Sequence, residues 1–251
     1  QCARNTYLAA ESARSEMQAE LEMARRAVDA KTAEVELLLA ELEEADALAL
    51  GPGLGLHLAT QDFVLDLLHA VARARPGMRV VVDTDALTAL AHADRSGGLR
   101  WEAFATLDLL LTPHPGEAAR LLRSGDAQDV QRDRVAAWRA LVERTGAVVL
   151  LKGAGTLTGT AQDAAPHQNP TGNPGMATAG AGDVLTGLLG ALLARGMTAA
   201  DAARLGAWLH GRAGDLAAAE GSPESLIAGD LLVTLPRAWR ALGPPSSTLA
   251  S

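Results

Sequence analysis

Four short apolar runs constrain the fold of this chain more than any other feature of its sequence. They lie at residues 46–50, 79–82, 107–111 and 147–151, and segments with apolar residues at helical spacing, such as 61–74, separate them. Buried strands that alternate with amphipathic helices predict an α/β fold, with a mostly parallel central sheet and helices on both faces. Such sheets bind ligands beyond the carboxyl ends of their strands, so the residues after each run are the first candidates for a functional site.

Each run is followed by a motif that contains glycine, acid, histidine or lysine. The first leads into Gly-Pro-Gly-Leu-Gly at 51–55, and the second into Asp83 and Asp85. The third leads into Pro-His-Pro-Gly-Glu at 113–117, and the fourth into Lys-Gly-Ala-Gly-Thr at 152–156. If the sheet is parallel, the four motifs share one edge of it, and we expect them to line one ligand site.

Each motif also has a plain structural interpretation, which the sequence leaves open. The glycines could form only a tight turn, and Asp83 and Asp85 could cap the helix that follows them. His114 and Glu117 could suggest a metal site, but no second histidine has ligand spacing, so we predict no metal held by protein side chains alone. Lys152 could be merely solvated, although a compact ammonium beside glycine N–H groups suits phosphate.

The stretch Asn169–Gly196 is the richest in chemical information. It begins as a loop with two prolines and two glycines, and then Ala-Gly-Ala-Gly-Asp at 179–183 leads into an apolar helical run at 184–193. The first turn of a helix has free N–H groups and the positive end of the helix dipole, which together favour an anion. Asp183 could simply cap this helix, but the glycines around it suit a phosphoryl-transfer site in which its carboxylate takes a proton.

Composition excludes several classes of protein. The chain has 251 residues and a net charge of −8 without a basic patch, so we expect no nucleic-acid partner. Its apolar runs are too short to cross a bilayer, and we find no secretory signal, so we expect a cytoplasmic protein without membrane attachment. The single cysteine, Cys2, excludes an intrachain disulfide.

Residues 1–45 form a distinct segment, rich in Ala, Glu and Arg and without Gly or Pro. Apolar or small residues and one lysine recur there at alternating spacings of four and three, which predicts an N-terminal helical segment with a weak heptad seam. It could pack on its own domain, join subunits as a coiled coil, or stand in for a truncated or replaced start of the domain. We therefore predict three parts: residues 1–45, an α/β domain at 46–243, and a flexible tail at 244–251.

The order of the motifs resembles that of the ADP/ATP-dependent NAD(P)H-hydrate dehydratases, a branch of the ribokinase-like superfamily. Gly-x-Gly-Asp alone is typical of the whole superfamily, whereas Asn-Pro-Thr-Gly-Asn-Pro-Gly-Met-Ala-Thr at 169–178 is far more specific to this branch. The resemblance covers residues 45 to about 242. One element departs from it: the family carries an Arg-x-Gly-Ala-Gly segment ahead of the 51–55 motif, and residues 1–45 contain none.

The resemblance implies a role for each motif. Contacts to the hydrated dinucleotide fall on Gly53, Gly55, His114 and Asp183, with Glu117 and the acids Asp83 and Asp85 near the same pocket. Contacts to ADP or ATP fall on Lys152, Gly153, Ala154, Gly155, Thr156 and Gly182. Asp183 is expected to be the catalytic base, and the N–H groups of Ala181, Gly182 and Asp183 are expected to hold the transferred phosphoryl group.

The reaction implied by the resemblance is repair of hydrated NADH and NADPH. ADP or ATP serves as co-substrate with Mg²⁺, and phosphate leaves together with AMP or ADP. The resemblance also implies a homo-oligomer such as a tetramer, and a separate NAD(P)H-hydrate epimerase as partner. Two other interpretations stay open: a small-molecule kinase of the same superfamily, and a truncated relative that binds nucleotide without catalysis.

Overall fold

A computed structural model describes residues 17–18, 22–23, 25, 33 and 35–243 of the chain. The chain divides into two units, Gln1–Glu44 and Ala45–Ser251. In the first unit, residues 35–41 are helical and lead into a 3-10 helix, η1 (Leu42–Glu44). Four positions of the predicted heptad seam, Leu21, Ala24, Val28 and Lys31, lie outside the described residues, and so does the predicted tail at 244–251.

The second unit is built on one six-stranded sheet. Its strands lie in the order of the sequence across the sheet, and the first four are parallel. The strands are β1 (Ala47–Leu50), β2 (Arg79–Val82), β3 (Asp108–Leu111), β4 (Val148–Leu151), β5 (Leu157–Gly159) and β6 (His167–Gln168). The last two are antiparallel: β5 pairs with β4, and β6 pairs with β5 at the edge of the sheet.

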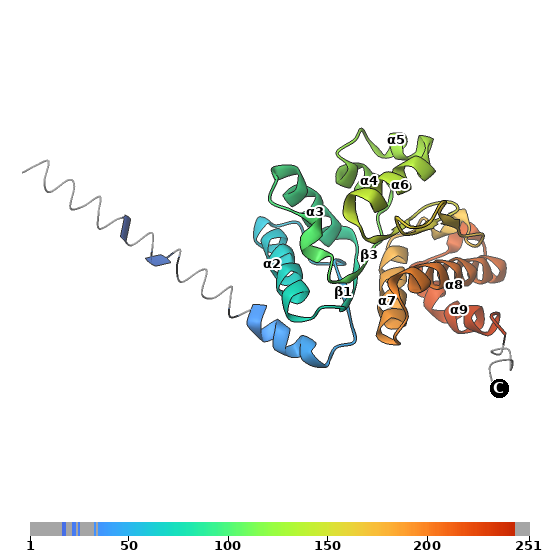
Figure 1. Ribbon diagram of the computed structural model, residues 1–251. Coiled ribbons are helices and arrows are strands. Elements are labelled where there is room, and N and C mark those ends of the chain that lie inside the picture. The colour runs from blue at the N-terminus through green and yellow to red at the C-terminus, as the bar shows by residue number, and fades with distance from the viewer. Residues whose placement is uncertain (1–16, 19–21, 24, 26–32, 34, 244–251) are drawn as a thin grey trace, which may run out of the picture. The chain divides into compact units, whose positions relative to one another are not determined.

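Helices cover both faces of this sheet, which confirms the predicted α/β class (Figure 1). On one face lie α7 (Ala181–Ala194) and α8 (Ala199–Glu220), with α9 (Ala228–Arg240) packed against them. The other face carries the helices α2 (Leu58–Ala74), α3 (Thr84–Ser96), α4 (Pro115–Leu122), α5 (Ala127–Arg132) and α6 (Arg134–Thr145). Three further 3-10 helices are η2 (Trp101–Phe104), η3 (Pro174–Met176) and η4 (Pro223–Ser225).

The alternation of side chains along each strand explains the two layers. Val81 and Leu110 point toward α7 and α8, where they join Leu185 and Leu189 in one buried cluster. Their neighbours in sequence point to the opposite face, and these are also fully buried. A strand that is apolar on both sides fits the interior of such a sandwich, and three of the four apolar runs became the central strands β2, β3 and β4. The first run became β1 at the edge of the sheet, where only Leu50 is buried.

Two helix boundaries depend on local capping and continuity. The chain breaks between α5 and α6 at Asp133, whose backbone is not helical and whose carboxylate caps α6 by accepting the N–H of Ala136 at 2.9 Å. By contrast, residues 199–220 form the single continuous helix α8. An Asp that caps a new helix interrupts a helical segment locally. The spacing of apolar residues does not show such an interruption.

Candidate functional site

The predicted motifs meet at the carboxyl edge of the parallel strands. At the centre is an ion pair between Lys152, after β4, and Asp83, after β2, with the Lys152 Nζ to Asp83 Oδ1 distance at 2.6 Å. Asp83 is fully buried, and the Lys152 side chain is 17% exposed. The carboxylate of Glu117 lies 3.8 Å from the same ammonium, which gives one lysine between two acids from neighbouring strand ends.

Asp83 does not cap the helix that follows it. It occupies the N-cap position of α3, but its side chain makes no capping hydrogen bond. Its second oxygen instead accepts a hydrogen bond from Thr186 Oγ1 at 2.6 Å, and Thr186 lies on α7. Asp83 therefore ties the ends of β2 and β4 to the helix on the other side, which the capping interpretation did not anticipate.

The first turn of α7 lies directly against this cluster. A Cβ atom built on Gly182 would lie 3.7 Å from Lys152 Nζ and 3.8 Å from Asp83 Oδ2. Among the described residues, the N–H groups of Gly182 and Asp183 have no acceptor, whereas the N–H of Ala181 donates to the Thr178 carbonyl at 3.3 Å. Two free amide donors thus lie beside the Lys152 ammonium. Free N–H groups at the start of a helix are a common feature of anion-binding sites.

The Asp183 side chain is exposed, and within the described part of the chain it has no hydrogen-bond or ion-pair partner. It stands at the third position of α7, where the helix dipole favours a negative charge. The helix begins at Ala181 after Gly180, whose φ of 82° is in the left-handed region. Asp183 is therefore not the N-cap, and its carboxylate is free to act on a ligand.

His114 and Glu117 form a capping box at the start of α4. His114 Nδ1 accepts the N–H groups of Gly116 at 3.0 Å and Glu117 at 3.4 Å, and Glu117 Oε2 accepts the His114 N–H at 2.8 Å. Burial and the nearby Lys152 and Arg120 charges lower the pKa of His114. An imidazole that accepts at Nδ1 carries its proton on Nε2, so this histidine presents a neutral N–H donor.

Glu117 is buried beside the Lys152 ammonium. Burial is the larger influence and raises the pKa of its carboxyl group, while Lys152 and the His114 N–H act in the opposite direction. Asp83 makes the closer contact to the ammonium, since it lies 2.6 Å from Lys152 Nζ and also accepts a hydrogen bond from Thr186 at 2.6 Å.

The loop at 152–156 is held from outside the site. Arg134 of α6 donates to the carbonyl oxygens of Leu151 and Lys152 at 3.1 and 3.2 Å, and a Cβ on Gly153 would collide with its guanidinium. Thr156 Oγ1 closes the loop on the Gly153 carbonyl at 3.0 Å. Ala154 is exposed at the tip of the loop.

The glycine motif at 51–55 contacts the same edge through Asp85. The Gly55 N–H donates to Asp85 Oδ2 at 2.7 Å, and Gly51 packs so closely on the Asp83 carbonyl that a Cβ there would lie 1.9 Å from the oxygen. Gly53 is open, with no atom within 4 Å of the position of a Cβ. The turn at 51–55 therefore contacts Asp83 and Asp85 at the strand end. The roles of Gly53 and Gly55 as ligand contacts remain predictions.

The loop at 169–178 is anchored on α8. Asn169 Nδ2 donates to the Ala207 carbonyl at 3.0 Å, and Thr171 Oγ1 donates to the Trp208 carbonyl at 2.9 Å. Gly211 and Gly214 on α8 leave room for Thr171 and Met176, because a Cβ at either position would overlap them. This explains why the loop motif and the glycines of α8 occur together.

Two supporting residues were missed by sequence reasoning: Thr186 and Arg134. Thr186 carried a signal, since it is a lone polar residue in an apolar helical run, one turn after Asp183. His210 Nε2 lies 2.9 Å from the Ala181 carbonyl, and burial lowers its pKa to about 4. It is the satisfied structural histidine that its apolar helix predicts, but its partner in α7 cannot be read from spacing.

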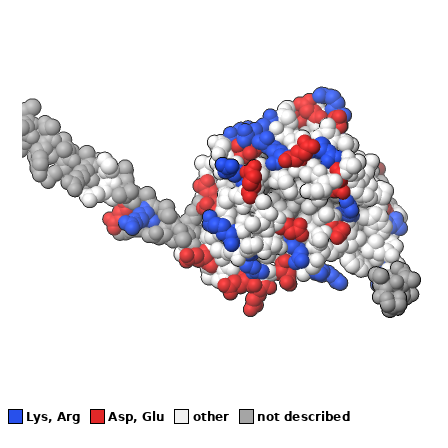
Figure 2. All heavy atoms as spheres, viewed as in Figure 1, with Lys and Arg blue, Asp and Glu red and all other residues white. Residues whose placement is uncertain are grey.

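Acidic and basic side chains are interspersed over the visible face of the second unit (Figure 2). Among the residues that the structure describes, no helix is long and apolar enough to cross a membrane. The described residues also include no group of three His, Cys, Asp or Glu side chains that could hold a metal ion.

A family model described as NAD(P)H-hydrate dehydratase matches residues 6–237. The chain is 45% identical over 217 residues to a bifunctional NAD(P)H-hydrate repair enzyme of Moorella thermoacetica, which covers 85% of this chain and 38% of that protein. It is 41% identical to an ADP-dependent (S)-NAD(P)H-hydrate dehydratase of Neisseria meningitidis, over 77% of this chain and 62% of the relative. The chain thus spans between about two fifths and three fifths of the length of these relatives.

A solved structure of the Bacillus subtilis ADP/ATP-dependent NAD(P)H-hydrate dehydratase, co-crystallised with ATP and Mg²⁺, matches with a TM-score of 0.65. The two chains are 32% identical, over 80% of this chain and 66% of that one. A ribokinase-like protein of Enterococcus faecalis matches with a TM-score of 0.68 at 26% identity, over 84% and 69% of the two chains. These matches confirm the predicted ribokinase-like fold.

Proposed function

Because the chain belongs to the NAD(P)H-hydrate dehydratase family, we propose that it restores NADH and NADPH from their hydrated (S) forms, with ADP or ATP as phosphoryl donor. One observation carries the proposal: the free N–H groups and exposed acid at the start of α7 lie against the ion pair of Lys152 and Asp83. A terminal phosphoryl group beside Gly182 would meet amide donors on one side and an ammonium on the other.

In this mechanism Asp183 acts as the base on the ring hydroxyl of the hydrated nicotinamide. The hydroxyl oxygen attacks the terminal phosphorus, the proton moves to the Asp183 carboxylate, and the bond to the departing AMP or ADP breaks. The N–H groups of Gly182 and Asp183 stabilise the charge on the transferred phosphoryl oxygens. Ala181 contributes a third donor only if its bond to Thr178 opens, since that N–H is already engaged.

Phosphorylation converts a poor leaving group into a good one. The lone pair of the ring nitrogen then expels phosphate by breaking the carbon–oxygen bond, and the adjacent ring carbon loses a proton to restore the double bond. The neutral His114, with its proton on Nε2, would bind the dinucleotide as a hydrogen-bond donor next to Glu117.

Lys152 to Thr156 would hold the nucleotide, with Lys152 on its phosphates and the glycines giving its backbone close access. The carboxylates of Asp83 and Glu117 are already committed to Lys152 and to neighbouring hydrogen bonds, so Mg²⁺ would be held mainly through phosphate oxygens. The ion supplies charge neutralisation between the phosphates.

The experiment is incubation of the protein with hydrated NADH, Mg²⁺ and either ADP or ATP. We expect recovery of the dihydronicotinamide absorbance together with one phosphate released per molecule restored. Recovery without any dependence on nucleotide would contradict the proposal. A stable phosphorylated product without recovery would identify a small-molecule kinase, and nucleotide binding without either would identify a non-catalytic relative.

We further propose a cytoplasmic homo-oligomer, with epimerisation of the hydrated dinucleotide carried out by a separate partner protein. Relatives that are named bifunctional NAD(P)H-hydrate repair enzymes support the proposal of a second repair activity beside the dehydratase. Residues 1–45 would serve as a helical extension of the dehydratase domain at 46–243. Sedimentation of the full chain against a chain that begins at residue 46 would test whether the extension joins subunits.

A further inference from the structure

A hollow of about 510 Å³ lies between α3 and α4, on the side of α4 that carries Gly116, Ala119, Arg120 and Arg123. These four positions follow helical spacing, so they form one face of the helix. Arg95, from the last turn of α3, completes the wall, and the connection from α4 to α5 closes it. A volume of this size is in the range of pockets that bind small molecules.

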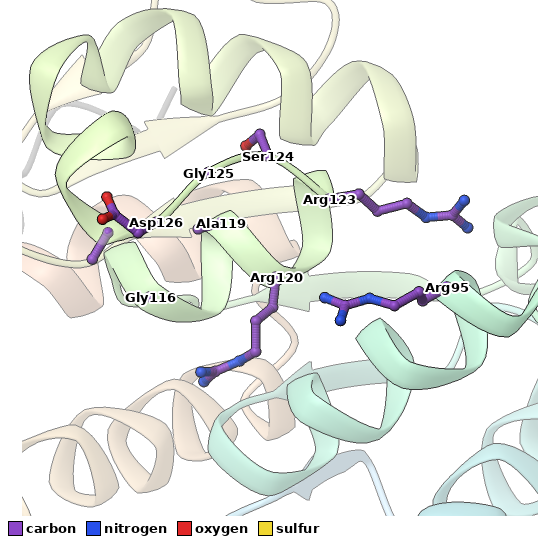
Figure 3. Close-up of a pocket in the computed structure, with 9 residues that line it drawn as sticks. Arg95, Gly116, Ala119, Arg120, Arg123, Ser124, Gly125 and Asp126 are labelled. Atoms are coloured by element: carbon purple, nitrogen blue, oxygen red, sulfur yellow. The ribbon is translucent and has the colours of Figure 1, made fainter.

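Three arginines line the hollow, and two of them lack an ion-pair partner among the described residues, although the Arg120 charge also lowers the pKa of Glu117. Within the part of the chain that the structure describes, Arg95 and Arg120 have no ion-pair partner, and Arg120 Nε is buried without a hydrogen-bond acceptor. In Figure 3 the Arg95 side chain extends from α3 toward α4, whereas the Arg120 side chain runs from α4 in another direction, and both residues line the hollow. A buried guanidinium N–H without an acceptor costs free energy unless a ligand supplies one.

The acids around the hollow are already engaged. Asp94 pairs with Arg123 and Arg144, at 3.1 and 2.5 Å. Asp126 caps α5 by accepting the N–H groups of Gln128 and Asp129, at 2.7 and 3.2 Å. Asp126 keeps its negative charge, but the arginines that line the hollow outnumber the acids, and Arg95 and Arg120 are the two without an ion-pair partner among the described residues.

The hollow adjoins the candidate site. Gly116 lines it and also donates its N–H to His114, and the Arg120 charge helps to lower the pKa of His114. A ligand that contacts His114 could thus extend past Gly116 to reach the guanidinium groups of Arg95 and Arg120.

We propose that this hollow binds a phosphate ester through Arg95 and Arg120. Arginine suits the group because its planar fork of donors matches phosphate oxygens. Two sources could supply the ester: the adenosine end of the hydrated dinucleotide, which rests on the function proposed above, or a separate phosphorylated metabolite.

The test is calorimetric titration with adenosine 2′,5′-bisphosphate while ATP and Mg²⁺ saturate the nucleotide loop. We expect the Arg95→Gln/Arg120→Gln double variant to bind the bisphosphate at least about tenfold more weakly than the wild type. Arg195→Gln, an exposed arginine at the far end of α7, should bind as the wild type does. Equal affinity in the wild type and the double variant, or no binding to either, would overturn the proposal.

Turnover with hydrated NADPH and hydrated NADH separates the two sources. A higher KM with unchanged kcat in the double variant assigns the hollow to the dinucleotide, and unchanged KM with lost bisphosphate binding assigns it to a separate metabolite. If no dehydration occurs in any variant but the arginine-dependent binding remains, the proposed function fails and this inference stands. The Arg95→Gln single variant controls for folding, because Arg95 is exposed. Weaker bisphosphate binding at an unchanged melting temperature would show that the loss of affinity does not come from unfolding.

Discussion

Two aspartates at the site have opposite environments. Asp83 is fully buried and bonds to Lys152 and Thr186, whereas Asp183 is exposed and has no partner among the described residues. Asp83 follows the end of β2, and Asp183 lies in the first turn of α7 at the same edge of the sheet. The difference indicates two separate roles: Asp83 fixes the geometry of the site, and Asp183 stays available for the reaction.

Asp183→Asn tests the reactive half of this comparison and has the largest expected effect. The amide keeps the shape of the side chain but cannot accept the hydroxyl proton, so we expect kcat to fall about a thousandfold. Nucleotide affinity should change little, and the free energy of unfolding by less than about 0.5 kcal/mol, because the side chain is exposed. Asp201→Asn is the matched control, since Asp201 holds the same position in the first turn of α8. Retained turnover would refute the role of Asp183 as base.

Asp83→Asn tests the structural half. It leaves the Lys152 ammonium, which is mostly buried, without its main counter-charge, so we expect a loss of about 3 kcal/mol in the free energy of unfolding. Urea denaturation measures this directly. A variant as stable as Asp183→Asn would show that the two acids do not differ as we describe.

His210→Gln tests how the first turn of α7 is supported from α8. Burial holds the pKa of His210 at about 4, below its ordinary value of 6.5, so the folded state binds fewer protons. Stability from this group is therefore complete above about pH 6.5 and is lost as the pH falls toward 4, by up to about 3 kcal/mol. Unfolding measured across this range should decline more steeply in the wild type than in His210→Gln. Parallel curves would contradict the assignment.

Gly182→Ala has the smallest expected effect, and its two readouts should move in opposite directions. Alanine favours a helix over glycine by up to about 1 kcal/mol, and its Cβ would make only ordinary contacts with Lys152 and Asp83. The methyl group would nevertheless occupy the space above the ammonium, so we expect about tenfold weaker binding of ADP or ATP. Tighter or unchanged binding would remove Gly182 from the phosphate site.

The sequence predicted the parallel core well because its signals are local. Each of the four parallel strands is a short apolar run that is followed at once by its motif, so the strands and the shared edge could be predicted together. The partners within the site could not be predicted. Thr186 bonds to Asp83 across 103 residues, and Arg134 holds a loop 18 residues away. Such pairings depend on how helices dock, which apolar periodicity does not specify.

The hollow beside α4 was also invisible in the sequence. Arg95 and Arg120 look like ordinary exposed charges on two helices, and only the packing of α3 against α4 brings them together. By contrast, Asp183 could be singled out because glycines surround it on both sides in the sequence.

The most direct test of the account is a crystal structure of the protein with Mg²⁺ and a non-hydrolysable ADP analogue. The account predicts the terminal phosphoryl group within hydrogen-bonding distance of the Gly182 N–H and Lys152 Nζ, with the Asp183 carboxylate facing it from the open side. A nucleotide bound away from the start of α7, with Asp183 directed toward solvent, would contradict it.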